Sequence, residues 1–461
     1  MAVRRALAFI VCCVWWSPAF AQWSQPLFLE AARDPGRADA APTARALAMG
    51  DLTLTSTGAD SALSAPAMLL FGSKTDIVVS FGTLRYARDE LVATPARLPP
   101  ILPGRRESPG TNAWMPYIAF AARSPVLAAG AFYDGTSRLT HSFESDETVL
   151  ETATVSGQGY SIKGQGAALT DFWARRIGGS VAVTPWRGRL AIGAAAYATR
   201  VDYTTRSEVD VQSTSIGFGP ISWVRRGFDR DVVDLHAWGV GYSLNVAARA
   251  GAHVTLSARW RHEPEVNATR VWSSEWTGSR LEQPVAFNLP DTYGAGAVFD
   301  FGPAKAAFEV ARSRYADVFT PAGGWLGDTA GDPHGDPHGL CSQLSTVFCS
   351  GWAFVTHRPS DATRWSAGVE HTIGGAGRAL LLRGGVGHEQ AYTLARSATD
   401  PYRNRQTPAI PSVTDFEPPR EAATWFSAGA GYRASHIEIG AGAQFGDQRF
   451  RFLADVRVMV P

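Results

Sequence analysis

Charge is scarce in this sequence of 461 residues, in which Asp, Glu, Lys and Arg together make up 18%, against about 25% in an average soluble protein. Beyond the first twenty residues the sequence also lacks any run of about 18 apolar residues, the length that a membrane-spanning helix requires. The formal net charge of +1 argues against a basic nucleic-acid-binding arm and against a polybasic membrane anchor. Glycine, by contrast, is abundant, with 46 residues. These properties leave two classes: a large soluble all-β protein or a membrane β-barrel.

Lysine is nearly absent. Lys74, Lys163 and Lys305 are the only three, so 40 of the 43 basic residues are arginine. We interpret this bias as genome composition. The alternative interpretation is functional, because the planar guanidinium fork of arginine suits the phosphate groups of an outer cell surface.

The first 21 residues have the three parts of a secretory signal peptide. Arg4 and Arg5 supply positive charge, residues 6–16 form a short apolar run, and Ala19-Phe20-Ala21 is a cleavage site of the A-x-A type. The sequence therefore predicts export through the general secretory route and a mature chain that begins near Gln22. The alternative is an uncleaved anchor, for which the apolar run is short.

Cysteine is rare as well. Of the four cysteines, Cys12 and Cys13 leave with the signal peptide. The other two, Cys341 and Cys349, lie in one Gly- and Pro-rich stretch. In an oxidising compartment we expect them to form a disulfide; the alternative is a reducible free pair.

A tandem repeat, Gly331–Gly339, stands just before these cysteines. Its His334 and His338, with Asp332 and Asp336, are weak candidates for metal ligands. The Gly and Pro content excludes a helix, so nothing fixes the two histidines on one face. We therefore favour an outer loop tied by the disulfide, and we expect neither a resident metal nor a cofactor.

From Asp76 onward the hydrophobic pattern has period two. In Arg449–Met459 the apolar residues at even positions alternate with a face that carries arginine and aspartate, and similar alternation runs through His253–His262, Tyr293–Phe301 and His436–Phe445. Alternation over about ten residues is typical of transmembrane β-strands, with apolar side chains toward lipid and polar ones toward the lumen. A soluble sandwich would have shorter strands, of about 5–6 residues.

Short and long connections alternate along the chain, as periplasmic turns and extracellular loops do in outer-membrane barrels. Six short turns and seven outer connections predict fourteen strands, an even number that leaves both termini in the periplasm. The sequence therefore predicts an all-β fold, a transmembrane antiparallel β-barrel over residues 76–461. The long connections are predicted at 86–111, 134–173, 203–231, 263–290, 316–362 and 393–423. The strands are predicted to begin near Asp76, Asn112, Val126, Ala174, Arg189, Val232, His253, Asp291, Lys305, Thr363, Ala379, Thr424, His436 and Arg449.

Residues 22–75 precede the first strand, and apolar and polar residues do not alternate in them. Within them, Ala40–Gly50 and Ala59–Leu70 are rich in Ala and Leu and predict short helices. The alternative, a disordered periplasmic tail, is disfavoured by this apolar content. We therefore expect the segment to fold into the lumen as a small helical hatch, as in other plugged barrels.

The predicted lumen face carries charges of both signs. Two interpretations stand side by side: the charges line a polar pore, or they pair with one another and with the hatch. We favour the second. The residues concerned are Arg259, Arg261, Arg364, Glu370, Glu438, Arg449, Arg451, Asp455 and Arg457.

Several short motifs follow one another in a recognisable order, namely Ala44–Asp51, Thr57–Ala62, Ala65–Ala67, Phe287–Gly294 and Trp425–Arg433. Together they resemble the N-terminal signature, the Leu-Pro-Asp strand entry and the late hairpin of the long-chain fatty-acid transporter (FadL) and toluene-transporter superfamily. They resemble the related PorV-like barrels as closely. The sequence departs from the family pattern at Ala48, where the family has glycine, at Ala65, where it has asparagine, and at the C-terminal Pro461, where an aromatic residue is common.

The resemblance implies an outer-membrane barrel closed by an N-terminal hatch, and an outward kink of the third strand that opens a lateral exit. The candidate for the kink is the stretch with Gly130, Asp134 and Gly135, where Asp134-Gly135 would break the pairing; the alternative is an ordinary Gly-rich strand end. The hatch residues that become candidates for gating or ligand contact are Arg45, Met49, Gly50, Asp60, Pro66, Met68, Leu69, Leu70 and Phe71.

The function that the resemblance implies is the uptake of hydrophobic compounds, such as long-chain fatty acids or aromatic hydrocarbons, across the outer membrane of a Gram-negative-type bacterium. The alternative is a PorV-like barrel that holds secreted proteins at the surface. We do not expect an enzyme, because no spacing singles out a Ser or Thr with a His as a catalytic pair. The expected partners are outer-membrane lipid and lipopolysaccharide, hydrophobic small molecules and the barrel-assembly machinery, with no nucleic acid.

Overall fold

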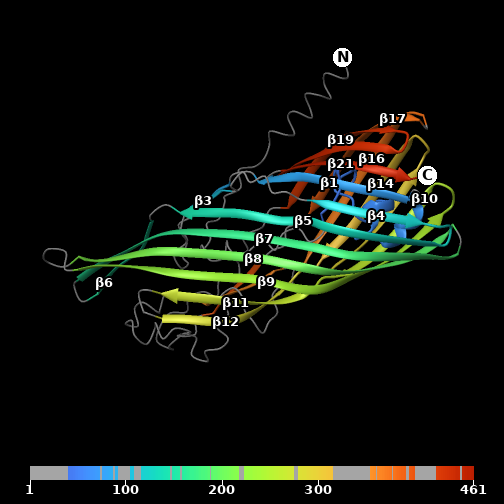
Figure 1. Ribbon diagram of the computed structural model, residues 1–461. Helices are drawn as coiled ribbons and strands as arrows, with labels where there is room; N and C mark the ends of the chain where they lie inside the picture. Colours follow the sequence, from blue (N-terminus) through green and yellow to red (C-terminus); the bar gives the residue numbers. More distant parts are fainter. Residues whose placement is uncertain are drawn as a thin grey trace, which may run out of the picture.

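A closed ring of antiparallel strands forms the body of the computed structural model (Figure 1). The structure describes residues 40–72, 75–86, 89–91, 104–107, 116–145, 148–155, 158–186, 188–216, 223–274, 279–314, 354–359, 361–375, 377–390, 394–399, 422–446 and 449–460. Within these residues the ring has fourteen strands, and the predicted all-β transmembrane barrel is confirmed. The strands are β1 (Thr75–Tyr86), β4 (Tyr117–Arg123), β5 (Leu127–Ser145), β7 (Gln158–Trp186), β8 (Leu190–Ile216), β9 (Trp223–Ala250), β10 (Val254–His262), β13 (Thr292–Asp300), β14 (Ala304–Ser313), β16 (Ala362–Gly374), β17 (Arg378–Glu389), β19 (Ala423–Ala434), β20 (Ile437–Gly446) and β21 (Arg449–Val460).

The ring closes where the first strand meets the last. Thr75 of β1 lies opposite Ala122 of β4 on one side and opposite Val460 of β21 on the other. Every other strand of the ring likewise has an antiparallel neighbour on each side. The sheet therefore leaves no open edge at membrane level, which is what lipid requires of a sheet whose backbone groups must all be bonded.

The outward face of the ring is apolar and the inward face is polar, as the period-two pattern predicts. On β21, Phe452 and Val456 are exposed on the outside, whereas Arg451 and Asp455, which directly precede them, are buried on the inside. A belt of exposed apolar side chains faces lipid in a membrane barrel.

No helix in the described part of the chain is long and apolar enough to cross a membrane.

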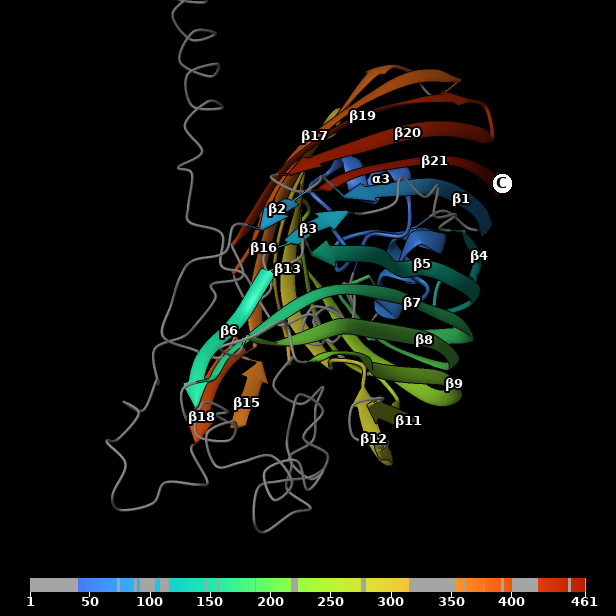
Figure 2. The same cartoon turned by 90° about the vertical axis from the view of Figure 1, so that its left-hand side faces the viewer.

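Three neighbouring strands are much longer than a membrane requires. β7, β8 and β9 have 29, 27 and 28 residues, whereas a tilted transmembrane strand needs about 9–11. Figures 1 and 2 show them running beyond the rim of the ring, where more strands continue the sheet. These are β2 (Asp89–Leu91), β3 (Gly104–Glu107), β6 (Thr148–Val155), β11 (Glu265–Ser274) and β12 (Ser279–Asn288); β15 (Phe354–Pro359) and β18 (Leu394–Thr399) form a separate two-stranded sheet.

The long connections predicted at 134–173, 203–231 and 263–290 are therefore wrong over much of their length, because the structure has strands there. Beyond the membrane neither face of a sheet has to be apolar, so a stretch such as 206–216 lacks the apolar face by which the other strands were predicted. Pairing with the neighbouring strand keeps it extended: Arg206 to Ser215 of β8 lie in register with Val232 to Trp223 of β9.

The described part of the N-terminal segment, residues 40–72, lies inside the ring (Figure 2), and we call it the hatch. It contains one short α-helix, α3 (Ala44–Ala48), and two 3-10 helices, η1 (Gly58–Ser61) and η2 (Pro66–Phe71). These helices are shorter than the predicted ones. Side chains of the wall bond several backbone groups of the hatch directly; the Ala67 N–H, for example, donates to Asn245 Oδ1 at 3.0 Å.

Glycines on the inner face of the wall let the hatch backbone approach closely. A Cβ added at Gly385 of β17 would overlap the backbone of Met49 and Gly50, and one added at Gly193 of β8 would overlap the backbone of Ala67. Part of the glycine excess of the sequence is therefore required by the contact between wall and hatch.

We predict that Gly385→Val destabilises the folded barrel by about 1–3 kcal/mol, because its side chain would have to displace the hatch backbone. Urea unfolding in detergent micelles, followed by the heat-modifiable mobility of the barrel, measures the effect. Gly384→Ala is the control, since a Cβ there meets nothing closer than the Ser427 carbonyl oxygen at 3.9 Å. Equal unfolding midpoints for the two variants would contradict the assigned contact.

Candidate functional site

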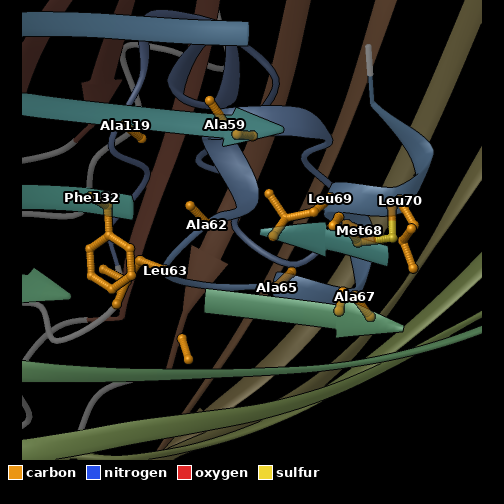
Figure 3. Close-up of a cluster of buried hydrophobic side chains, with 14 of the residues drawn as sticks. Ala59, Ala62, Leu63, Ala65, Ala67, Met68, Leu69, Leu70, Ala119 and Phe132 are labelled. Carbon is orange, nitrogen blue, oxygen red and sulfur yellow. The ribbon is translucent and has the colours of Figure 1, made fainter. Parts of the chain in front are cut away.

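The hatch meets two chemically different halves of the wall. Residues 59–70 pack against the inner faces of β4, β5, β7, β8 and β9, where the buried side chains are mainly Ala, Tyr and Phe (Figure 3). Residues 41–54 face β14, β16, β17 and β19 to β21, where the wall carries arginines and carboxylates. We call these the apolar half and the charged half of the lumen.

Met68 and Leu69 lie at the centre of the apolar half, each 1% exposed. Leu63 belongs to the same cluster, as does Phe132 of β5, whose ring meets Tyr197 of β8 edge-on with centroids 6.1 Å apart. The side chains that were predicted to contact a ligand are thus packed on the wall. An apolar molecule would reach them where hatch and wall separate, and that contact stays a prediction.

Other predicted hatch residues lie elsewhere. Met49 packs with Leu52 and with Ala307 of β14. Phe71 ends η2 and is partly buried, with the Arg249 guanidinium carbon 4.9 Å from the centre of its ring. The predicted residues therefore do not form one pocket; they are distributed along the whole contact between hatch and wall.

Arg45 is the main ionic contact of α3. Its guanidinium donates to both carboxylate oxygens of Glu370 on β16, each at 3.0 Å. Glu370 also accepts from Arg383 of β17 at 2.8 Å, and Arg383 in turn donates to Glu438 of β20 at 2.5 Å. The carboxylate of Glu370 raises the pKa of Arg45 above its ordinary value, which keeps this side chain a cation.

Asp51 closes a turn that occupies the left-handed region, with φ of +94° at Gly50 and +71° at Asp51. A non-glycine residue rarely adopts this conformation. Here the Asp51 carboxylate accepts the Ala41 N–H at 2.7 Å and a bond from Arg451 of β21 at 3.1 Å, while Arg364 of β16 lies 3.5 Å away. The ionic contacts fix the strained turn against the wall.

Glu309 of β14 binds the backbone that follows. Its carboxylate accepts the N–H of Thr53 at 2.9 Å and of Leu54 at 2.8 Å, and Arg364 donates to the same carboxylate at 3.2 Å. The predicted pairing of lumen charges with one another and with the hatch is therefore what the structure shows at Arg364, Glu370 and Arg451. Glu309, which the prediction did not include, takes part in the same way.

Asp60 binds the hatch to the seam where the barrel closes. Its carboxylate pairs with Arg457 of β21, which also lies 3.5 Å from Asp76 of β1. Asp76 accepts the Ala59 N–H at 3.1 Å, and the Tyr117 hydroxyl of β4 donates to the Ala59 carbonyl at 2.9 Å. One short hatch segment thus bridges the last, first and second strands of the ring.

Neutral polar side chains complete the attachment. Ser427 of β19 accepts the Gly50 N–H at 2.8 Å and Trp425 donates to the Gly50 carbonyl at 3.2 Å, while Ser243 of β9 donates to the Leu63 carbonyl at 3.1 Å. The sequence marks these as polar residues at inward positions of predicted strands. It does not show which hatch group each one meets, so sequence reasoning missed them.

The third strand of the ring, β5, has an irregularity where the kink is predicted. Asp134 lies opposite Arg176 of β7 and Ser137 lies opposite Ala174, so two residues of β5 face one of β7. Arg176 donates to Asp134 Oδ2 at 3.1 Å and to Ser137 Oγ at 2.9 Å. Such a bulge bends a strand and re-aims its side chains. It places Asp134 and Gly135 at a break in the pairing; whether the break opens the wall stays a prediction.

Arg176 also connects the bulge with the seventh strand. The guanidinium reaches Glu263, just past the end of β10, at 3.1 Å, and Arg261 lies 3.0 Å from the same carboxylate. Gly130, near the start of β5, lies beside the hatch: a Cβ at Gly130 would be 3.3 Å from the Cβ of Ala62.

The predicted disulfide of Cys341 and Cys349 and the weak metal candidates His334 and His338 lie outside the described residues. Within the described residues no group of three or more His, Cys, Asp or Glu side chains is arranged to hold a metal ion.

Neither a family model nor a curated protein sequence matches this chain. Among solved structures, the toluene transporter TbuX of Ralstonia pickettii superposes with a TM-score of 0.52 at 12% identity, over 91% of this chain and 98% of that one. The chain has the fold of a toluene-transporter barrel. The toluene transporter TodX of P. putida aligns over the same shares, at 13% identity and a TM-score of 0.47. The resemblance carried by the sequence motifs is confirmed as a likeness of fold.

We predict that Arg45→Met loosens the hatch, because it leaves the buried Glu370 with one cation fewer; breaking a buried pair costs about 3–5 kcal/mol, and less here because Arg45 is 18% exposed. Limited proteolysis of the protein in detergent should cut the hatch faster than in the unaltered chain. Arg280→Met removes an ion pair whose side chains are 68% and 56% exposed, and should leave the rate unchanged. A hatch equally protected in both variants would contradict the role of Arg45.

Proposed function

We propose that this protein takes up hydrophobic compounds, such as long-chain fatty acids or aromatic hydrocarbons, through a hatch-gated barrel in the outer membrane. The fold shared with TbuX supports a channel of this class. The observation that carries the proposal is the division of the lumen into an apolar half and a charged half, each bound to its own part of the hatch.

The two halves differ in what separation would cost. On the charged side, moving the hatch away would separate Arg45 and Asp51 from their ionic partners, and unpaired buried charges cost several kcal/mol each. On the apolar side it would expose side chains such as Met68 and Leu69, and a hydrophobic molecule that entered would cover them again. A hydrophobic ligand therefore compensates for opening on the apolar side alone, whereas water or a polar solute does not.

The bulge of β5 lies on that same side. Gly130 borders the hatch cluster and Phe132 belongs to it, two residues before Asp134. A molecule that moved between the hatch and the apolar half would reach the wall where its pairing is broken. We propose this break as the lateral exit, so that the ligand leaves into lipid without crossing the charged half.

A PorV-like role in holding secreted proteins is the second candidate, favoured by the strands that extend beyond the rim. Mass spectrometry of the protein purified in detergent separates the two. Bound fatty acids or hydrocarbons support transport, while a reproducible protein partner with no apolar ligand supports the second role.

We predict that Ala62→Cys combined with Gly130→Cys locks the hatch to the third strand. The Cβ separation of 3.3 Å is close to the roughly 3.5–4.5 Å of a disulfide, and the Ser180 hydroxyl beside Gly130 can rotate away. Uptake of radiolabelled toluene and oleate by cells that express the oxidised variant should fall to the level of cells without the protein. It should recover on mild reduction, and each single variant is a control. Uptake unaffected by oxidation would refute a moving hatch on this side.

We also predict that deletion of Gly135, which leaves one residue opposite Arg175 in place of two, makes the β5–β7 ladder continuous and lowers uptake of the same compounds. Deletion of Gly188 in the β7–β8 turn, distant from the hatch, serves as the comparison. Heat-modifiable mobility shows whether each variant folds. A folded variant without Gly135 that transports normally would exclude this exit while leaving the hatch mechanism intact.

A further inference from the structure

A row of arginines stands on the outer face of β5, β7 and β8, directly above the apolar belt. On β7 the outward side chains of Ile177, Val181 and Val183 are about half exposed, and the stretch from Ile177 to Trp186 matches the roughly 9–11 residues that a strand needs to cross a membrane. The next outward residue is Arg175. Its end of the strand carries the long connections, which face the cell exterior in outer-membrane barrels.

Arg138, Arg175 and Arg200 lie side by side in this row. Arg138 of β5 pairs in register with Trp173 of β7, and Arg175 pairs with Arg200 of β8. Both Arg138 and Arg175 have their guanidinium carbons near the Trp173 ring, 5.0 Å and 4.2 Å from its centre. The indole Nε1 donates to the Gly135 carbonyl of the bulge at 3.1 Å, which fixes the ring.

The bulge itself is what brings Arg138 into the row. Asp134 faces the lumen opposite Arg176, and if β5 alternated regularly through Gly135 and Thr136 instead of bulging there, the outward and inward positions of β5 would be exchanged beyond this point. A one-residue change in register moves every following side chain to the other face. Arg138 would then point into the lumen.

The row faces carboxylates as well. Asp202 accepts from Arg175, from Arg200 at 3.1 Å and from His236 of β9 at 2.8 Å. Asp234 lies 3.3 Å from His236, and farther out on the same face stand Asp171 and Arg206. Counting these groups with His236 neutral gives four arginines against three aspartates, a net charge of +1.

Arg138 differs from its neighbours. No carboxylate in the described residues pairs with it, and its Nε has no hydrogen-bond partner there although the atom is buried. Arg175 also has an unpartnered buried Nε, while its terminal nitrogen binds Asp202. The guanidinium groups of Arg138 and Arg175, both beside the indole ring of Trp173, thus keep N–H groups available at the level where lipid head groups begin.

We propose that Arg138 and Arg175 bind a phosphate group of an outer-leaflet glycolipid of the lipid A type, with Arg200 as a further donor. A guanidinium matches phosphate through two parallel N–H···O bonds. The acyl chains of such a lipid would lie along the apolar belt formed by Ile177 and its neighbours. The inference uses the orientation of the barrel and does not depend on what the barrel transports.

Binding of purified bisphosphorylated lipid A to the full-length protein in detergent tests the proposal, measured by native mass spectrometry and by the rise in Tm. The double variant Arg138→Gln, Arg175→Gln should bind it about tenfold more weakly for each guanidinium removed. Lipid A stripped of its phosphates should bind the unaltered protein as weakly as the variant binds the intact lipid. The comparison of intact with dephosphorylated lipid A tests the role of the phosphate on the unaltered protein, so its result is valid even where the variant folds poorly.

Arg312→Gln is the matched control. Arg312 is also an arginine near the outer end of a ring strand, but it is bonded to Asp361 through two nitrogens. Its removal should leave lipid A binding unchanged. Equal binding by the double variant, or by the dephosphorylated lipid, overturns the proposal. Complete competition by inorganic phosphate at equal concentration would overturn the lipid assignment and leave a site for free phosphate.

Discussion

A charge buried inside a narrow barrel has to be neutralised there, and this constraint organises the structure. The inner face of β14 to β21 buries arginines and carboxylates among small and apolar residues; the buried charged side chains include Glu309, Arg364, Glu370, Arg383, Glu438, Arg451 and Asp455. The hatch supplies the missing partners: Arg45 for Glu370, Asp51 for Arg451 and Arg364, and backbone N–H groups for Glu309. Removing the hatch would take these partners away from charges in a low-dielectric interior, at a cost above that of breaking an exposed ion pair. The hatch is thus part of the folded barrel rather than an appendage to it.

The same constraint explains why the hatch is irregular. A long helix would satisfy its own backbone groups and leave little for the wall to bind. Short turns such as Gly50-Asp51 instead present N–H and C=O groups to Ser427, Trp425 and Glu309. Glycines of the wall, such as Gly193 and Gly385, stand where the hatch backbone comes close. Composition, hatch shape and lumen charge are therefore three aspects of one contact. The apolar half contacts residues 61–70 of the hatch, which carry no charged side chain, and the ion pair of Asp60 with Arg457 lies at the seam.

Much of this architecture could be predicted from the sequence, because the membrane imposes a simple rule on it. Where lipid covers the outside, apolar and polar side chains must alternate along each strand. The starts of β10, β20 and β21 were therefore predicted within a few residues. Beyond the membrane that rule lapses, so the outer halves of β7, β8 and β9 were missed. The site divides in the same way. An inward Glu309 or Arg451 could be read from the pattern, but its partner lies hundreds of residues away in sequence, and no local pattern records which two meet.

The near absence of lysine acquires a physical meaning from these contacts. Arg383 donates to two carboxylates on different strands, and Arg451 donates at once to Asp51 and to the Ala41 carbonyl. A planar fork with several fixed donors can do this at low hydration cost, whereas a lysine ammonium is a compact, strongly hydrated point charge. Genome composition can supply arginine in place of lysine. What the fold adds is a set of partners: in the lumen, carboxylates bind Arg364, Arg383 and Arg451. At the outer rim, beside Trp173, a carboxylate binds Arg175, whereas no carboxylate among the described residues pairs with Arg138. In the described part of the wall, Arg138 therefore keeps N–H groups available to an external anion, and the bulge of the third strand places it on the outer face.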